Sequence, residues 1–340
     1  MKAIVQDKYG DSSVLHLGDV PVPRIRENEV VIKVRATSLN IGDVHLMTGL
    51  PLMMRPVVGL TGPRQKVRGM DVAGHVFSVG PGVTDYKVGD AVFGVVEGGL
   101  AAYARASVKK IAPVPSSLTL EQAAALPTSG ATALHALRDA GNIQAGQRVL
   151  IIGASGGVGI FATQLAHAFG AHVTAVASAA KLDFVRSLGA DEVIDYATDF
   201  TEDDFTEREE RYDLIVDMAS SHSLEALQRV LTEEGTLVIV GGENGGRFSG
   251  GVGRMVVAPL RGLRSKQKLR GLVSATSAAD LAALVELVEA GKLAPVIDSV
   301  VPLAEAADAA HRLETGETIG KLVITQPSPH LRPEGLAAAT

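Results

Sequence analysis

The sequence contains no cysteine. This absence excludes disulfide bonds, thiolate nucleophiles and cysteine-ligated zinc together. The sequence also lacks an uninterrupted apolar run close to the roughly 18 residues that a transmembrane helix requires. The N-terminal residues have no signal-peptide apolar core and lead directly into a strand pattern, so the cytoplasm is the expected compartment.

An excess of positive charge is missing too, since the formal net charge is −6. Neither nucleic acid nor an anionic membrane is therefore indicated as a partner. The nine histidines are scattered and form no H-x-x-x-H pair, so no metal site is predicted. What is present is a 340-residue chain with 46% hydrophobic residues, which is enough for two domains with a large core.

The first 120 residues are predicted to be rich in β-structure, because short alternating runs are broken by Gly, Pro, Asn and Asp. From 121 to 275 the pattern changes to strands alternating with helices, which predicts a doubly wound parallel sheet. The predicted strands of that sheet are 148–153, 171–177, 192–195, 213–217, 236–241 and 269–273.

The residues after 275 are too few for a core of their own. The pattern in this part of the chain predicts two helices, Asp280–Ala290 and Ala304–Leu313, and two strands, one ending near Val301-Pro302 and one over Lys321–Thr325. The Pro- and Ala-rich end, Pro327–Thr340, is expected to fray. We expect this tail to return to the first domain. The predicted division is thus 1–120 with 276–340, a discontinuous catalytic domain, and 121–275, a cofactor domain.

A glycine-rich turn follows the first strand of the predicted cofactor domain. Its glycines are Gly153, Gly156 and Gly159, after the apolar run Val149–Ile152 and before a helical pattern. Bare glycine backbone lets a diphosphate approach a helix N-terminus, where free N–H groups favour anions. The spacing predicts a dinucleotide site, and the alternative is a strand–helix turn without a ligand.

The next strand ends without an acidic residue. In an NAD site an Asp or Glu at this point binds the ribose 2′-hydroxyl. Here Ser178 and Lys181 follow the strand, and the first acid is Asp183. A hydroxyl and a lysine suit a 2′-phosphate, so NADP(H) is the predicted cofactor. The alternative for Lys181 is an ordinary solvated lysine.

A basic stretch lies toward the end of the predicted cofactor domain, where residues 244–279 contain no acid. It is interpreted either as a positive rim for an anionic ligand or as a solvated face. Its basic residues are Arg247, Arg254, Arg261, Arg264, Lys266, Lys268 and Arg270.

Several motifs now show a family likeness. Gly69-Met70-Asp71-Val72-Ala73-Gly74, Val79-Gly80-Pro81-Gly82-Val83 and Val88-Gly89-Asp90-Ala91-Val92 resemble the medium-chain dehydrogenase/reductase superfamily. The turn Ala154–Gly159 resembles its zinc-independent quinone oxidoreductase branch. The resemblance implies a GroES-like catalytic domain, a Rossmann cofactor domain, and a homodimer as one expected assembly. Met70 stands where zinc enzymes of this superfamily carry histidine, and Met is a poor zinc ligand.

The resemblance also implies site residues. An Asn followed three residues later by Asp marks the nicotinamide side, and here these are Asn40 and Asp43. Asn40 could instead be a turn residue, and Asp43 a residue that starts a helix. His45 stands where relatives often carry a tyrosine, and it is either a proton donor or part of the pocket wall. These three are the predicted catalytic residues.

Further cofactor contacts are implied on both sides of the predicted cleft. Thr128 and Thr132 match residues that line the nicotinamide side, and Lys321 matches a lysine at the cleft edge. The predicted cofactor-binding set is Asn40, Thr128, Thr132, Gly153, Ser155, Gly156, Gly157, Val158, Ser178, Lys181, Tyr196, Gly241, Gly242, Val273 and Lys321.

The resulting functional prediction is an NADPH-dependent reductase of quinones or α,β-unsaturated carbonyls. Without a metal to polarise a carbonyl, acceptors already activated by conjugation are favoured. Two alternatives stay open, a zinc-free alcohol dehydrogenase or carbonyl reductase and a catalytically quiet NADPH-binding protein.

Overall fold

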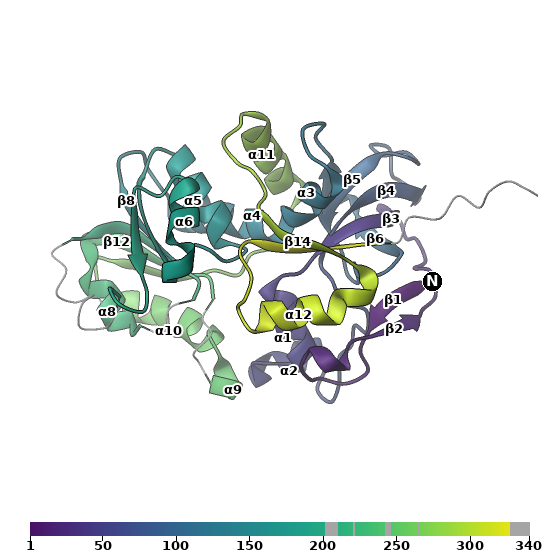
Figure 1. The fold of residues 1–340 in the computed structure, drawn as a ribbon, viewed down its shortest axis with the longest axis horizontal. Helices are drawn as coiled ribbons and strands as arrows, with labels where there is room; N and C mark the ends of the chain where they lie inside the picture. Colours follow the sequence, from purple (N-terminus) through teal and green to yellow (C-terminus); the bar gives the residue numbers. More distant parts are fainter. Residues whose placement is uncertain (201–209, 220–221, 242–245, 264, 327–340) are drawn as a thin grey trace, which may run out of the picture.

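The computed structural model describes residues 1–200, 210–219, 222–241, 246–263 and 265–326. Two large sheets make up the molecule, and Figure 1 shows them side by side, with the teal and green sheet on the left and the purple, blue and yellow sheet on the right. The predicted frayed end, 327–340, lies outside the described residues. None of the described helices is long and apolar enough to cross a bilayer.

The six-stranded sheet is parallel, with the order β10-β9-β8-β11-β12-β13. This order places a topological switch point between β8 and β11, where ligands of doubly wound sheets bind. The predicted α/β class is thereby confirmed. The strands are β8 (Arg148–Ile152), β9 (His172–Ala177), β10 (Glu192–Asp195), β11 (Tyr212–Asp217), β12 (Leu231–Ile239) and β13 (Lys268–Gly271).

Five of the six predicted strands differ from the structure at one end or both, and the largest differences are in β12 and β13. β12 begins at Leu231 rather than at 236, because Glu233, Glu234 and Gly235 interrupt the apolar pattern on which the prediction relied. β13 ends at Gly271, so Val273 lies beyond the strand and is 88% exposed. Helices cover this sheet, namely α4 (Pro127–Leu134), α5 (Gly159–Ala168), α6 (Leu182–Ser187), α8 (Leu224–Arg229) and α10 (Val252–Gly262). The short helix α9 (Gly246–Ser249) instead contacts the 3₁₀ turn Leu52–Met54 of the other half.

The second sheet has seven strands, with the order β14-β15-β3-β4-β5-β7 and β6 paired to β3. The chain end does return to it, because β15 pairs with β3 in an antiparallel register. These strands are β3 (Glu29–Ser38), β4 (Asp71–Val79), β5 (Ala91–Val95), β6 (Tyr103–Ser107), β7 (Ile111–Pro113), β14 (Ile297–Pro302) and β15 (Lys321–Thr325). β1 (Lys2–Val5) and β2 (His16–Asp19) form a separate hairpin.

The helices around this sheet include the two predicted near the chain end. Of these, α11 (Ala278–Glu289) begins two residues before the prediction, and α12 (Ala306–Glu314) follows a 3₁₀ turn at Leu303–Glu305. The others are α1 (Ile41–Thr48), α2 (Arg55–Val58) and α3 (Leu120–Ala125). We propose the division 1–120 with 276–340 and 121–275 as the domain organisation, because it assigns each sheet to one part.

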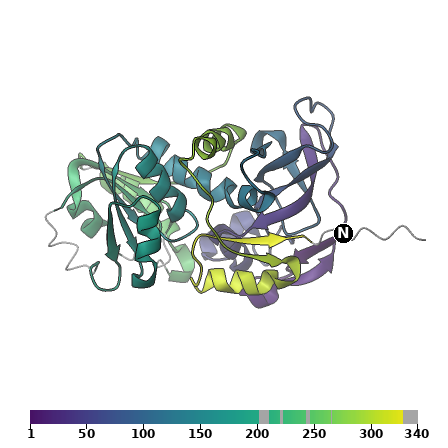
Figure 2. The same cartoon turned by 45° about the horizontal axis from the view of Figure 1, so that its top comes forward.

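The main hydrophobic core continues from one sheet to the other. It includes Ala36 and Phe93 of the seven-stranded sheet, Val149 and Leu214 of the six-stranded sheet, and Leu134 of α4 between them. Figure 2 shows α4 and α11 over this junction. Since close-packed interiors resist deformation, this shared core fixes the strand ends of the two sheets against each other.

Candidate functional site

The glycine turn joins β8 to α5, and its glycines have different roles. Gly153 has a φ of +87°, which favours glycine. A Cβ on Gly159 would lie 2.2 Å from the Gly153 carbonyl oxygen, so the packing of the chain itself excludes a side chain there. A Cβ on Gly156 would meet only that same oxygen, at 3.5 Å. The space beside Gly156 is therefore open, as a diphosphate site requires.

The same turn reaches the other sheet. A Cβ on Gly157 would lie 3.3 Å from Lys321 Cδ and 3.4 Å from Ser129 Oγ. The Gly320 amide donates to the Ser155 carbonyl oxygen at 3.0 Å. The glycine turn and the start of β15 therefore contact each other at the junction of the two sheets, and we call this contact, between Ser155–Gly157 and Gly320–Lys321, the wall.

Behind this wall lies a buried polar cluster, which we define as Asn40, Asp71, Thr128, Ser129 and Lys321. Lys321 is 1% exposed, and its Nζ donates to Asn40 Oδ1 at 2.5 Å, to the Leu39 carbonyl oxygen at 2.9 Å and to Ser129 Oγ at 3.1 Å. Asp71 is fully buried and lies 4.0 Å from Lys321 Nζ. The lysine predicted at the cleft edge is thus an interior residue of the free protein.

The carboxylate of Asp71 accepts hydrogen bonds from two other members of the cluster. Asn40 Nδ2 donates to Asp71 Oδ2 at 3.0 Å, and both the amide and the hydroxyl of Thr128 donate to Oδ1. Burial raises the pKa of Asp71, while the nearby ammonium of Lys321 and these hydrogen bonds oppose that rise. Burial likewise lowers the pKa of Lys321 against the pull of Asp71. Each charge therefore depends on the other for its compensation.

The amide of Asn40 is almost fully committed inside this cluster. Its Oδ1 accepts from Lys321 and from Ser129 Oγ at 3.1 Å, and its Nδ2 donates to Asp71. An amide nitrogen has two hydrogens, so one N–H of Asn40 remains. Asn40 was predicted as a nicotinamide contact, and that single N–H is the group with which its side chain can make one.

Asp43 connects α1 to the segment before β4. Its Oδ2 accepts from the Asn40 amide at 3.0 Å, and its Oδ1 accepts from the Gly69 amide at 3.2 Å. Both carboxylate oxygens are bound to backbone donors, which favours the helix-start interpretation over a catalytic one. His45 follows in the middle of α1 and is half-buried.

Burial raises the pKa of Asp43 from its ordinary 3.8 to about 6. The negative charge of Asp71 raises it further, whereas the hydrogen bond from the Asn40 amide lowers it. The folded chain then holds a proton that the unfolded chain has released, so stability falls as pH rises from 3.8 to about 6. Between roughly pH 5 and pH 7.5, the free energy of unfolding of the wild-type protein should therefore fall by about 1 kcal/mol more than that of the Asp43→Asn variant.

Urea unfolding at the two pH values measures this difference. Asp183→Asn is the matched control, because the Asp183 side chain is fully exposed. This variant should show the same pH dependence of stability as the wild-type protein. An identical pH dependence in wild type and Asp43→Asn would contradict the burial argument.

On the predicted adenosine side, Lys181 already has partners. Its Nζ donates to the carbonyl oxygens of Thr318 at 2.9 Å and Gly316 at 3.4 Å. Ser178 precedes it at the start of a 3₁₀ turn, Ala179–Lys181. Tyr196 is 59% exposed, and its amide donates to the carbonyl oxygen of Ala177 at the end of β9. Since an ammonium has three donors, one N–H of Lys181 remains for a further acceptor.

The other residues predicted to contact the cofactor lie around the junction of the two sheets and differ in how deeply they are buried. Thr132 is buried on α4, and Val158 precedes α5. The Gly241 amide donates to the Asp217 carbonyl oxygen at 3.4 Å, past the end of β12, whereas Gly242 lies outside the described residues. Two cluster members were missed by the prediction, Asp71, although it stood in a quoted motif, and Ser129, which no motif marked.

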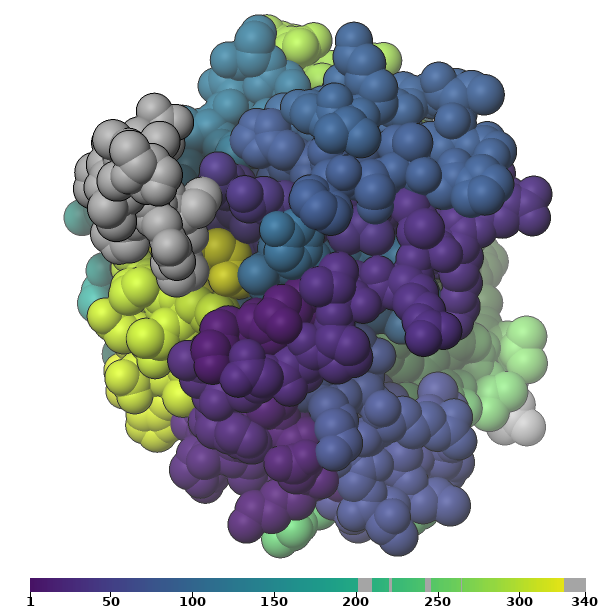
Figure 3. All heavy atoms as spheres, turned by 90° about the vertical axis from the view of Figure 1, so that its right-hand side faces the viewer, coloured from purple at the N-terminus to yellow at the C-terminus, as the bar shows by residue number. Residues whose placement is uncertain are grey.

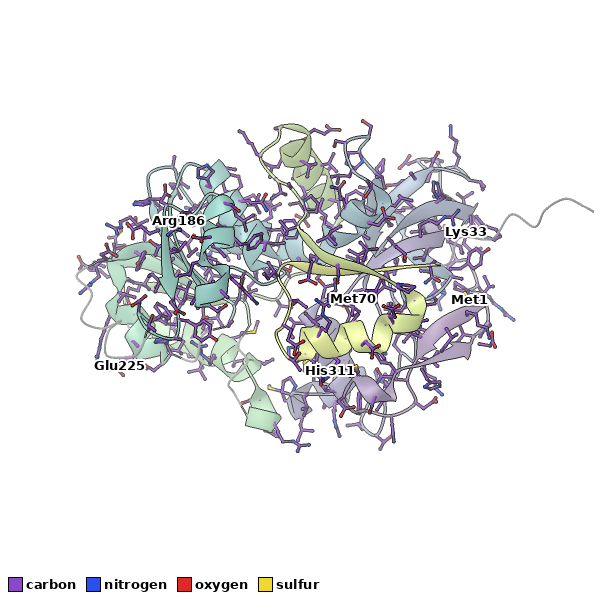
Figure 4. All side chains as sticks on the ribbon, in the orientation of Figure 1. Met1, Lys33, Met70, Arg186, Glu225 and His311 are labelled. Atoms are coloured by element: carbon purple, nitrogen blue, oxygen red, sulfur yellow. The ribbon has the colours of Figure 1, made fainter. Side chains whose placement is uncertain are left out.

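The donor set for zinc is not assembled. Within 1–200, 210–219, 222–241, 246–263 and 265–326, no three or more His, Cys, Asp or Glu residues gather as metal ligands do. Met70 instead packs toward the backbone of α1, where a Cβ on Gly42 would lie 2.9 Å from Met70 Cε. Figure 4 places Met70 centrally, between the parts that carry Arg186 and Met1. These residues do not fit a zinc ion.

Three of the seven basic residues in the stretch near α10 pair with acids. Arg254 Nη2 lies 3.0 Å from Asp217 Oδ2, Arg261 pairs with Glu225 and Lys266 with Glu233. Arg270 donates to the backbone carbonyl oxygens of Asp139 and Ala140. These contacts favour a structural interpretation over a positive rim. Arg264 lies outside the described residues.

Two family models match this chain. One, described as an alcohol dehydrogenase GroES-like domain, covers residues 26–116, and the other, described as a zinc-binding dehydrogenase, covers 188–324. The chloroplast envelope quinone oxidoreductase homolog of Arabidopsis thaliana is 35% identical over 95% of this chain and 98% of its own length.

Solved structures agree with these matches. The quinone oxidoreductase from Coxiella burnetii has a TM-score of 0.82 and 32% identity, covering 96% of this chain and 99% of that one. A mycobacterial protein solved in complex with NADPH has a TM-score of 0.81 and 26% identity, with coverage of 96% and 99%. The chain therefore belongs to the medium-chain dehydrogenase/reductase superfamily. Within it, its homologues are those of the quinone oxidoreductase branch, as the motifs predicted.

Proposed function

We propose that this oxidoreductase uses NADPH to reduce quinones or α,β-unsaturated carbonyls without a metal ion. The observation that carries the proposal is the open face of Gly156, beside a wall that ends at the buried polar cluster. A turn with room for a diphosphate therefore adjoins rigidly held polar groups. The quinone oxidoreductase names of the homologues support the same reaction class.

In this proposal the backbone of the turn Gly153–Val158 binds the diphosphate. Ser178 and Lys181 bind the 2′-phosphate, with the remaining N–H of Lys181 as a donor, and Tyr196 packs beside the adenosine. The residues proposed for the nicotinamide side are Asn40, Thr128, Thr132, Gly241, Gly242, Val273 and Lys321. NADPH, when bound, supplies a hydride for the acceptor.

The chain's own contribution is positioning. Lys321, Ser129 and Asp71 hold Asn40 in one orientation, so its remaining N–H is fixed before any ligand arrives. Because the described residues gather no three or more His, Cys, Asp or Glu side chains that could hold a metal ion beside a localised alkoxide, the proposal favours an acceptor that delocalises charge onto oxygen. His45, on the same helix as Asp43, is the proposed proton donor if water does not serve.

Steady-state kinetics test the proposal with two cofactors and matched acceptors. We expect kcat/KM to be at least about tenfold higher with NADPH than with NADH, from one charge-assisted contact to the 2′-phosphate. The oxidation of NADPH should be much faster with 1,4-quinones or conjugated enals than with saturated ketones of similar size. A saturated ketone as best substrate would favour carbonyl reduction instead, and NADPH binding without turnover of any acceptor would favour a binding protein.

A further inference from the structure

Four large apolar side chains are exposed at one end of the molecule. They are Met53, Val57, Leu60 and Phe248, with exposed fractions of 39%, 73%, 69% and 72%. Met53 and Val57 lie four residues apart in the helical run formed by the 3₁₀ turn Leu52–Met54 and α2, so their side chains are neighbours on its surface. Leu60 follows the end of α2 by two residues.

Phe248 comes to the same end from the part of the chain that carries the six-stranded sheet. It lies in α9, which contacts the turn Leu52–Met54. A Cβ on Gly250 would lie 3.2 Å from Pro51 Cβ, so the two segments touch directly. Figure 1 labels α2 and α9 close together at the lower end of the molecule, and Figure 3 shows slate-blue and green atoms at that end. We call the surface formed by Met53, Val57, Leu60 and Phe248 the apolar tip.

The charge around the apolar tip has one sign. Residues 44–70 and 246–263, which supply the tip, contain no aspartate or glutamate, although the whole chain has a net charge of −6. Asp7 approaches the first of these segments, but its carboxylate pairs with Lys66, with Oδ1 2.8 Å from Nζ. The negative charge of the chain is therefore carried by other parts of its sequence.

Two exposed arginines flank the apolar tip. Arg64 Nη2 donates at 3.4 Å to the carbonyl oxygen of Pro56, the residue before Val57, and Arg247 directly precedes Phe248. Single exposed apolar residues are ordinary on a protein surface, whereas a group of them with a polar margin marks an interaction site. A basic margin without acids matches the surface of an anionic bilayer, where headgroups attract arginine and the acyl boundary takes up apolar side chains.

We propose that the apolar tip inserts into the headgroup region of an anionic lipid bilayer, with Arg64 and Arg247 binding lipid phosphates. This inference reverses the expectation drawn from the net charge of the chain. A bilayer senses the charges within a Debye length of its surface, about 10 Å, rather than the sum over the whole molecule. The docking needs no cofactor and is independent of the proposed NADPH reaction.

Co-sedimentation with lipid vesicles tests the docking. At low ionic strength the wild-type protein should bind mixed phosphatidylcholine and phosphatidylglycerol vesicles at least about tenfold more tightly than phosphatidylcholine vesicles. Arg64→Gln combined with Arg247→Gln should remove most of this preference. Val57→Ser combined with Phe248→Ser should weaken binding to the mixed vesicles at least about tenfold. Val88→Ser is the matched control, because Val88 is 64% exposed between β4 and β5, and this variant should bind as the wild-type protein does.

Insertion can be measured separately, because the chain contains no tryptophan. A tryptophan introduced by Phe248→Trp or Val57→Trp should shift its emission to shorter wavelength when mixed vesicles are added, and one introduced by Val88→Trp should not. The proposal is overturned if the wild-type protein does not bind the mixed vesicles, if it binds phosphatidylcholine vesicles equally well, or if the double arginine variant keeps its preference. Binding without an emission shift in Phe248→Trp and Val57→Trp would show adsorption by charge alone and would also overturn it.

Discussion

Replacing Gly156 with valine should raise the Kd of NADPH at least about a hundredfold while leaving the fold intact. The protein itself has room for a side chain at this position, because a Cβ there meets only the Gly153 carbonyl oxygen, at 3.5 Å. The proposed diphosphate does not have that room, since it must approach bare backbone. Fluorescence titration measures the Kd, and the thermal midpoint of the free protein measures its stability.

A neighbouring glycine provides the contrast. Gly159→Val should destabilise the free protein severely, because its Cβ alone would lie 2.2 Å from the Gly153 carbonyl oxygen and 2.6 Å from the backbone of Ala154. Gly156→Ala should weaken NADPH binding less than Gly156→Val. If Gly156→Val folds and binds NADPH as the wild-type protein does, the glycine turn is not the diphosphate site.

Lys321→Met should cost about 3–5 kcal/mol of folding stability, which is the usual cost of removing one partner of a buried ion pair. The substitution removes three hydrogen bonds from Nζ and leaves Asp71 without its compensating charge. Urea unfolding monitored by circular dichroism gives the free energy of unfolding of both proteins. Lys292→Met is the control, because Lys292 is exposed, and its effect should stay within about 0.5 kcal/mol.

The double variant Lys321→Met with Asp71→Asn tests the reason for that loss. Removing both charges should recover part of the stability, so the two substitutions should cost less together than the sum of their separate costs. The coupling energy should exceed about 1 kcal/mol. Additive effects would show that Lys321 stabilises the fold through packing and its neutral acceptors, rather than through Asp71.

The sequence predicts the periodic parts of this molecule better than its buried polar cluster. The strands β8 and β11 follow from the apolar runs Val149–Ile152 and Leu214–Val216, and the glycine turn follows from its position between strand and helix. The cluster combines Asn40, Asp71, Ser129 and Lys321, which are far apart in the chain. No local pattern encodes such a meeting, because the packing of the two sheets creates it.

Lys321 illustrates this limit most clearly. A lysine after a glycine is expected to be exposed, since lysines are rarely buried unless they are paired. Only the placement of β15 beside β3 brings its Nζ to Asn40 and Asp71. Asp43 shows the same limit. Its distance from Asn40 in the sequence fits both a helix cap and a catalytic pair, and only the fold brings the Gly69 amide to its second oxygen, which favours the cap.

The segment just before β15 belongs by sequence to one half of the molecule but is fastened to the other. Lys181 holds the carbonyl oxygens of Gly316 and Thr318, and Ser155 holds the amide of Gly320. Any movement between the halves would therefore have to break these hydrogen bonds or carry the segment along with the cofactor half. Ser155 and Lys181, which are proposed to contact the cofactor, thus also join the two halves of the molecule.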